Sequence, residues 1–123
     1  TFENTPGQEL VQKLETYGEE LPYIAENGMF VSMQMNAYLY VVEQYFDFTE
    51  PEKGLLYLQK FEKLYTHYPG VEINHQQVGD AYSAAAVYYF KQNQLQKARH
   101  YLSRGLEISP DNYELIYRLR SIE

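Results

Sequence analysis

The feature that most constrains this chain is an internal repeat of a helical pattern. The stretch from Tyr38 to Leu58 aligns without gaps with the stretch from Tyr82 to Leu102, 44 residues further along. Small and aromatic residues at three- and four-residue spacings place close helix contacts on one face. The sequence therefore predicts two copies of one helix pair. Matching positions are Tyr38 and Tyr82, Val41 and Ala85, Tyr45 and Tyr89, Gly54 and Ala98, and Leu58 and Leu102.

Apolar periodicity and helix-breaking residues give the order of the helices. Residues 22–28 form a connector with room for one helical turn, and no stretch alternates apolar and polar residues as a strand does. We expect an all-α chain of about six helices, some of them long. The expected helices cover residues 5–21, 29–46, 51–68, 75–91, 95–108 and 112–123.

Five short polar residues are each followed three positions later by Gln or Glu. This spacing is typical of helix N-termini, because the first side chain can accept a hydrogen bond from a free amide of the first turn. We expect each to cap the helix that follows it. The pairs are Thr5 with Gln8, Thr49 with Glu52, Asn74 with Gln77, Asn93 with Gln96, and Asp111 with Glu114.

Residues 75–110 are the more regular copy, and they resemble a tetratricopeptide repeat (TPR). Repeats of that family have about 34 residues, with aromatic, small and proline residues at fixed offsets. The resemblance implies a single domain over residues 1–123, built as an antiparallel helix-pair solenoid. Residues 29–69 would be a divergent repeat, 5–21 an N-terminal helix, and 111–123 a capping helix or the start of a truncated repeat. The matching residues are Tyr82, Ala85, Ala86, Tyr89, Ala98, Leu102, Gly105 and Pro110.

Composition and charge exclude several classes of function. The formal net charge is −7, and a negative field opposes binding to nucleic-acid phosphates and to anionic membranes. The chain has no cysteine, which removes thiolate catalysis and cysteine-based zinc sites. The three histidines form no metal-ligand pair at helical spacing, and the serines lack a nucleophile motif. We therefore expect no enzyme activity, no metal and no cofactor.

The sequence leaves the cellular location open. No apolar run approaches the ~20 residues needed to cross a membrane, which predicts a soluble chain. Thr1 is not an initiator methionine, so we interpret the chain as a fragment without its native N-terminus. Both a cytoplasmic and an exported protein fit this composition.

The resemblance implies a binding surface on the first helix of each pair, which lines a concave groove in this family. Helical spacing supports this placement, because residues 36, 40, 43 and 47 share one face, as do 80, 84, 87 and 91. The acidic members favour a basic or neutral protein or peptide as partner. The residues carried over are Asn36, Leu39, Tyr40, Glu43 and Asp47, and then Asp80, Ser83, Ala84, Val87 and Lys91.

The leading hypothesis is a non-catalytic module that binds a protein or peptide segment on this concave face, with Tyr40, Glu43, Asp80 and Val87 at the centre of the contact. In one alternative, the chain is a regulatory or spacer domain of a larger enzyme or transcription regulator and packs on neighbouring domains. In another, it self-associates weakly through the apolar stripe of the last helix. That stripe consists of Leu115, Ile116, Leu119 and Ile122.

Overall fold

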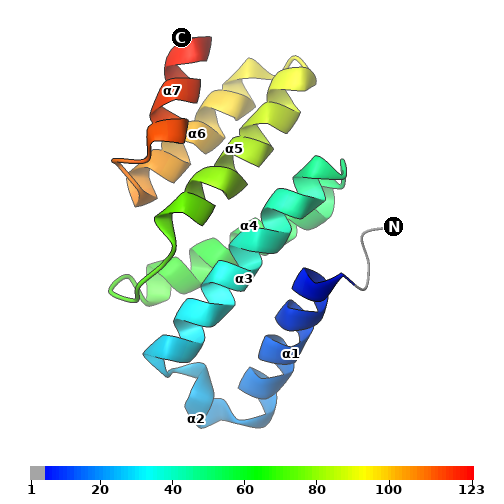
Figure 1. Ribbon diagram of the computed structural model, residues 1–123, viewed down its shortest axis with the longest axis vertical. Coiled ribbons are helices and arrows are strands. Elements are labelled where there is room, and N and C mark those ends of the chain that lie inside the picture. The colour runs from blue at the N-terminus through cyan, green and yellow to red at the C-terminus, as the bar shows by residue number, and fades with distance from the viewer. Residues whose placement is uncertain (1–4) are drawn as a thin grey trace.

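A computed structural model describes residues 5–123, and all regular secondary structure in this range is helical (Figure 1). The all-α prediction is confirmed. The described range has seven helices rather than about six, because the expected turn in the connector is a four-residue helix, α2. The helices are α1 (Pro6–Glu20), α2 (Pro22–Ala25), α3 (Gly28–Asp47), α4 (Pro51–His67), α5 (His75–Lys91), α6 (Leu95–Ile108) and α7 (Tyr113–Ile122).

Two helix pairs form the body of the molecule. Helix α3 packs along α4, and α5 packs along α6, with a three-residue connection inside each pair (Figure 1). The pairs meet mainly through α3 and α5. Helix α1 packs on α3, and α7 packs on both α5 and α6. The first helices of successive pairs, α3 and α5, therefore lie side by side, and α7 extends this row.

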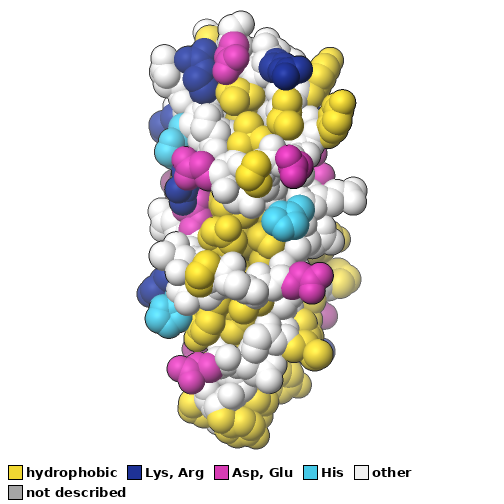
Figure 2. Space-filling view, turned by 90° about the vertical axis from the view of Figure 1, so that its left-hand side faces the viewer, with side chains coloured by type: hydrophobic (Ala, Val, Ile, Leu, Met, Phe, Trp, Pro, Cys, Tyr) yellow, Lys and Arg dark blue, Asp and Glu magenta, His cyan; other side chains and the backbone are white. Residues whose placement is uncertain are grey.

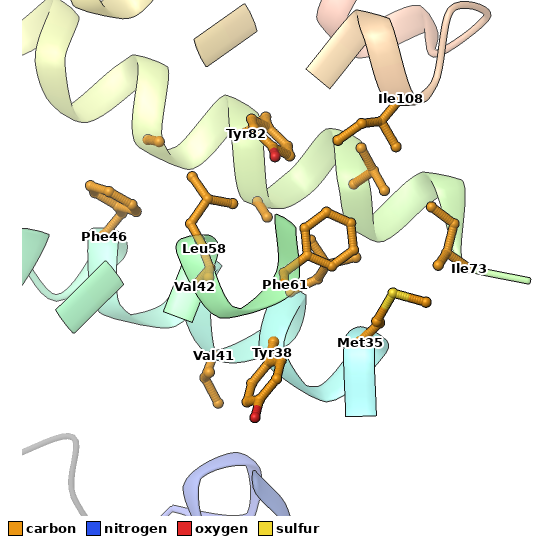
Figure 3. Close-up of a cluster of buried hydrophobic side chains, with 14 of the residues drawn as sticks. Met35, Tyr38, Val41, Val42, Phe46, Leu58, Phe61, Ile73, Tyr82 and Ile108 are labelled. Carbon is orange, nitrogen blue, oxygen red and sulfur yellow. The ribbon is translucent and has the colours of Figure 1, made fainter. Parts of the chain in front are cut away.

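Helix α3 is the central helix, and its predicted burial on more than one side is confirmed. Half of its twenty residues are buried, and the helix contacts α1, α4 and α5. Each large apolar side chain removed from water contributes about 1.5–3 kcal/mol. Figure 3 shows how Leu58 and Phe61 of α4 lie among the side chains of α3 and α5, including Val42 and Tyr82.

The internal repeat is present as repeated side-chain contacts. In the first pair, Tyr45 stacks on Tyr57 with ring centroids 5.6 Å apart, and the Lys53 ammonium lies 5.7 Å from the Tyr45 ring. In the second pair the two centroids are 5.5 Å apart and the ammonium–ring distance is 5.1 Å. The 44-residue offset thus relates equivalent positions in space. The equivalent residues of the second pair are Tyr89, Tyr101 and Lys97.

A second set of repeated contacts joins each pair to the helix before it. The Tyr38 hydroxyl donates a 2.7 Å hydrogen bond to Glu15 of α1, and Lys60 of α4 binds the same carboxylate at 2.8 Å. In the next pair, a tyrosine of α5 and an arginine of α6 bind one carboxylate of α4 in the same way. We call each arrangement a tyrosine–carboxylate tie. The residues of the second tie are Tyr82, Glu62 and Arg104.

Removing the hydroxyl of the second tie is expected to destabilise the fold. The Tyr82 side chain is fully buried, and burial followed by the Glu62 charge raises its phenol pKa, so the hydroxyl stays protonated as a donor. A hydrogen bond to a charged acceptor contributes about 1.5–3 kcal/mol. Tyr82→Phe should lower the unfolding free energy in urea by this amount. The control Tyr23→Phe, at a ring that is 77% exposed, should have no effect; equal effects would refute the tie.

Two of the five predicted N-caps are wrong in the same way. Thr49 and Asn93 have left-handed backbone angles, with φ of 56° and 64°. The amides of Glu50 and Gln94 bond the carbonyls five residues back, which is the closing pattern of a helix C-terminus. Both residues therefore end α3 and α5 instead of starting α4 and α6, whose N-terminal residues have no side-chain cap.

A third N-cap is displaced by one position. The side chain that accepts from the Leu115 amide belongs to Asn112, rather than to Asp111. The predicted caps at Thr5 and Asn74 are confirmed, since each accepts a hydrogen bond from the amide three residues on. Helix α3 has a cap that the sequence reasoning missed, Asn27.

The left-handed backbone conformation of Thr49 predicts that glycine at this position stabilises the fold. A β-branched residue at positive φ is strained, whereas glycine adopts this conformation at no steric cost. Thr49→Gly should therefore raise the unfolding free energy by about 1 kcal/mol. The matched change Asn93→Gly should have a smaller effect, because asparagine tolerates this region. Thermal unfolding measures both, and a loss of stability for Thr49→Gly would contradict the assignment.

No helix in the described range 5–123 is both long and apolar enough to span a membrane.

Candidate functional site

The row formed by α3, α5 and α7 carries an open hollow of about 180 Å³. We call it the acidic hollow, because four of its eight lining residues are acids. It contains six of the ten proposed contact residues, brought together from α3 and α5. The lining residues are Glu43, Asp47, Asp80, Ser83, Ala84, Val87, Glu114 and Arg118.

Two proposed contact residues do not lie on this surface. Leu39 is 0% exposed and belongs to the core, so the expectation that it contacts a partner is wrong. Tyr40 is 42% exposed but faces α1, since a Cβ built on Gly7 would lie 2.8 Å from its ring. Both lie at the edges of the predicted helical face. The core buries Leu39 at one edge, and α1 packs against Tyr40 at the other.

Asn36 and Lys91 also lie outside the acidic hollow. The Asn36 side chain accepts a 2.9 Å hydrogen bond from the Asn74 amide, so it holds the start of α5 against α3. Lys91 is exposed at the end of α5, and its charge partly offsets the burial that raises the pKa of Asp47. These two residues position α5 and modify the local field rather than line the hollow.

Sequence reasoning missed the contribution of α7. Glu114 and Arg118 are four residues apart, and the Arg118 Nε and Nη2 atoms each lie 3.3 Å from Glu114 Oε2. The Glu–Arg spacing signals an ion pair on one helix. This spacing does not show where the helix packs, so it gave no sign that the pair lines a hollow. In the structure it forms one wall of the hollow.

Burial and neighbouring acids raise the pKa values of two carboxyls in the hollow, those of Glu43 and Glu114. Partial burial and the nearby charges of Asp80, Asp47 and Glu114 raise the pKa of the Glu43 carboxyl. Burial also raises the pKa of Glu114, and the Asp80 charge adds to this shift, although Arg118 opposes it. Neither Glu43 nor Asp80 forms an ion pair with a base in the described part of the chain. The hollow therefore carries negative charge that the fold does not neutralise.

This charge predicts a pH dependence of stability. A carboxyl whose pKa is raised by folding binds its proton more tightly in the folded state, so stability increases as the pH falls toward its ordinary pKa and is lost as the pH rises. The wild type should gain thermal stability between pH 7.5 and pH 5. Glu43→Gln removes one repelling charge beside Asp80, Asp47 and Glu114, and should be more stable at pH 7 with a smaller gain on acidification.

The matched control for this pH prediction is Glu9→Gln, at an exposed acid of α1. Its stability should follow the wild-type pH profile. The prediction fails if the Glu43 and Glu9 variants have the same profile in thermal unfolding measured by circular dichroism.

The apolar stripe of α7 is largely used inside the molecule. Leu115 is 0% exposed, and Leu119 and Ile122 are partly buried against the core. The stripe is therefore not a fully free surface, since Leu115 is unavailable to a second copy of the chain. It docks α7 onto α5 and α6 instead, because a short amphipathic helix must bury its apolar side.

A polar contact beside the acidic hollow involves one of the three histidines. His75 Nδ1 lies 2.5 Å from Ser109 Oγ, which links the first turn of α5 to the end of α6. Ser109 is 3% exposed. The pair borders a wider depression that also includes Asp80 and Glu114. Among residues 5–123, no three histidine or acidic side chains are arranged to hold a metal ion.

Comparison with known proteins does not assign a family to this chain. No protein-family model matches it, no curated protein matches it, and no solved structure matches it. The resemblance to tetratricopeptide repeats therefore stays a prediction that depends on the residues of the helix pairs.

Proposed function

We propose that this chain is a TPR-like helical solenoid domain that binds a protein or peptide segment and has no catalytic role of its own. The binding surface would be the acidic hollow and the row of α3, α5 and α7 around it. One observation carries the proposal: three helices, each from a different layer, contribute side chains to a single open hollow. A surface shared by successive layers is the kind that solenoid proteins use for recognition.

Repetition of contacts supports the solenoid part of the proposal. The stacked tyrosines recur in both pairs at the 44-residue offset, and so does the tyrosine–carboxylate tie. In the first tie α1 supplies the carboxylate that binds the tyrosine of α3, and in the second tie α4 supplies the carboxylate that binds the tyrosine of α5. The first pair thus contacts α1 in the same way as the second pair contacts α4, as expected when stability comes from nearest-neighbour interfaces.

Unneutralised charge supports the binding part. Packing four acids around one hollow raises the free energy of the isolated chain through repulsion and partial desolvation. A purely structural surface gains nothing from such an arrangement. A basic partner would relieve the repulsion on binding, and the negative field would speed its association.

Peptides selected on the domain from a random displayed library test this proposal. Glu43→Lys/Asp80→Lys should weaken their binding at least about tenfold while the helical circular dichroism stays unchanged. The matched control Glu9→Lys/Glu19→Lys reverses two exposed charges on α1 and should bind within about twofold of wild type. Equal loss in both variants, or no loss in either, would show that the hollow is not the site.

A second candidate is a regulatory or spacer domain that packs on a neighbouring domain. It is favoured by exposed apolar side chains at α2 and the start of α3, where Tyr23 is 77%, Met29 76% and Met33 50% exposed. Figure 2 shows hydrophobic side chains gathered at the lower end of the molecule. Helix α2 and the first turns of α3 lie at this end (Figure 1). Tyr23→Ser/Met29→Ser should leave peptide binding at the hollow intact, and a loss of that binding would favour this second candidate.

A further inference from the structure

We propose that the acidic hollow receives one cationic side chain, an arginine or a lysine, from the bound segment. Glu43 and Asp80 would supply the negative charge, the Ser83 hydroxyl oxygen would accept a hydrogen bond, and Ala84 and Val87 would contact the side-chain stem. This inference rests on the proposed function and specifies the chemistry of the partner.

The acidic hollow has more acidic than basic side chains. The hollow has acids from three helices and one lining base, Arg118. That base already binds Glu114 through two nitrogens. Glu43 and Asp80 keep no cationic partner among the described residues. One cation entering the hollow would complete a second ion pair beside the first, in a partly buried position where screening by salt is reduced.

The hollow also contains a buried hydroxyl with no hydrogen-bond partner among the described residues, that of Ser83. Ser83 lies in the middle of α5, is 3% exposed, and lines the hollow. Its Oγ atom is buried and has no hydrogen-bond partner among residues 5–123. Leaving a buried polar group unpaired costs about 1–3 kcal/mol. An entering N–H donor would remove this cost, and both ammonium and guanidinium groups supply such donors.

The shape and lining of the hollow favour a side chain over a metal ion. No three acidic or histidine side chains in the described range are placed to ligate one metal. Ala84 and Val87, both partly exposed, add an apolar wall next to the acids. Arginine and lysine combine an apolar stem with a charged end, so they match a site that is half apolar and half acidic. The guanidinium of Arg118 already lies against Glu114 in this hollow, and a second one would meet the same kind of acceptor.

Amide NMR titration of the described domain with N-acetyl-arginine methylamide tests this inference. Binding of a single side chain should be in the millimolar range and saturable, with the largest shifts at Glu43, Asp80, Ser83 and Ala84. The matched probe is the citrulline amide, which has the same shape without the charge. It should cause no saturable shift, and added NaCl should weaken the arginine response.

Two variants separate the parts of the site. Asp80→Asn should weaken arginine binding at least about fivefold. Ser83→Ala should weaken it about two- to threefold without lowering thermal stability, because it removes only the unsatisfied hydroxyl. The control Glu52→Gln, at an exposed acid of α4, should bind as wild type. Unchanged binding by Ser83→Ala or Asp80→Asn would overturn the assignment.

Other outcomes distinguish this inference from the proposed function. Saturable shifts at the same amides with MgCl₂ or CaCl₂, but not with the arginine amide, would assign the hollow to a metal and overturn the inference. If selected peptides bind the α3–α5–α7 row yet carry no basic residue, the cationic site is wrong and the proposed function stands. If no peptide binds the row while the arginine amide does, the inference stands and the proposed function is wrong.

Discussion

Replacing Phe61 with alanine should lower the free energy of unfolding by about 3–5 kcal/mol. The ring is 0% exposed and lies in the core between α3 and α5, in the buried cluster that also contains Leu58, Val42 and Tyr82 (Figure 3). The truncation removes the ring from an apolar site and leaves a cavity that the packed helices cannot close. Folded domains are stable by only 5–15 kcal/mol, roughly, so the variant should unfold well below the wild-type urea midpoint.

The matched control is Phe90→Ala on α5, where the ring is 50% exposed. It removes the same atoms from a half-exposed site and should lower the free energy of unfolding by about 1 kcal/mol or less. Urea unfolding followed by circular dichroism gives both values. If the two substitutions cost the same, Phe61 is not the core residue that the structure shows.

Placing a methyl group at Gly79 should detach the start of α7. A Cβ at this position would lie 2.4 Å from Asn112 Nδ2 and 2.6 Å from Oδ1, closer than real Cβ atoms approach other atoms. Asn112 would have to leave, and it makes two hydrogen bonds. Its oxygen accepts from the Leu115 amide at 3.1 Å, and its nitrogen donates to the His75 carbonyl at 2.9 Å. Alanine gains about 1 kcal/mol of helix propensity, so the net cost should be about 1–3 kcal/mol.

Three measurements separate this mechanism from general damage. Hydrogen exchange should speed up first in α7, whereas the amides of α3 stay protected. Gly28→Ala, where a Cβ would have no neighbour within 4 Å, should be neutral or slightly stabilising. The double variant Gly79→Ala/Asn112→Ala should cost little more than Asn112→Ala alone, because both remove the same contacts. Additive losses would contradict the role of Asn112.

The fold could be predicted from sequence where the signal is local. Prolines at 6 and 51 each begin a helix as expected, and the 44-residue repeat predicted both helix pairs. The predicted N-caps at Thr49 and Asn93 were wrong, because a polar residue between two helices can end the first helix or start the second. The three-residue connection decides this, by requiring a left-handed residue that reverses the chain.

The candidate site was less predictable, because periodicity identifies a helical face but not its neighbours. Glu43, Asp80 and Val87 lie together as expected. Leu39 and Tyr40 fall at the edges of the same predicted face, where packing on other elements removes them. The Glu114–Arg118 pair completes the hollow only because α7 docks on α5, which no spacing within the last helix encodes.

The wall that α7 contributes to the acidic hollow carries no net charge. Helix α7 brings one acid and one base to the acidic hollow, Glu114 and Arg118, and they are paired with each other. Docking or removing α7 is therefore electroneutral at the hollow. It alters the width of the hollow and the desolvation of Glu43 and Asp80, but it leaves the summed charge that an approaching partner meets the same. In this arrangement, the width of the hollow can change without any change in its net formal charge.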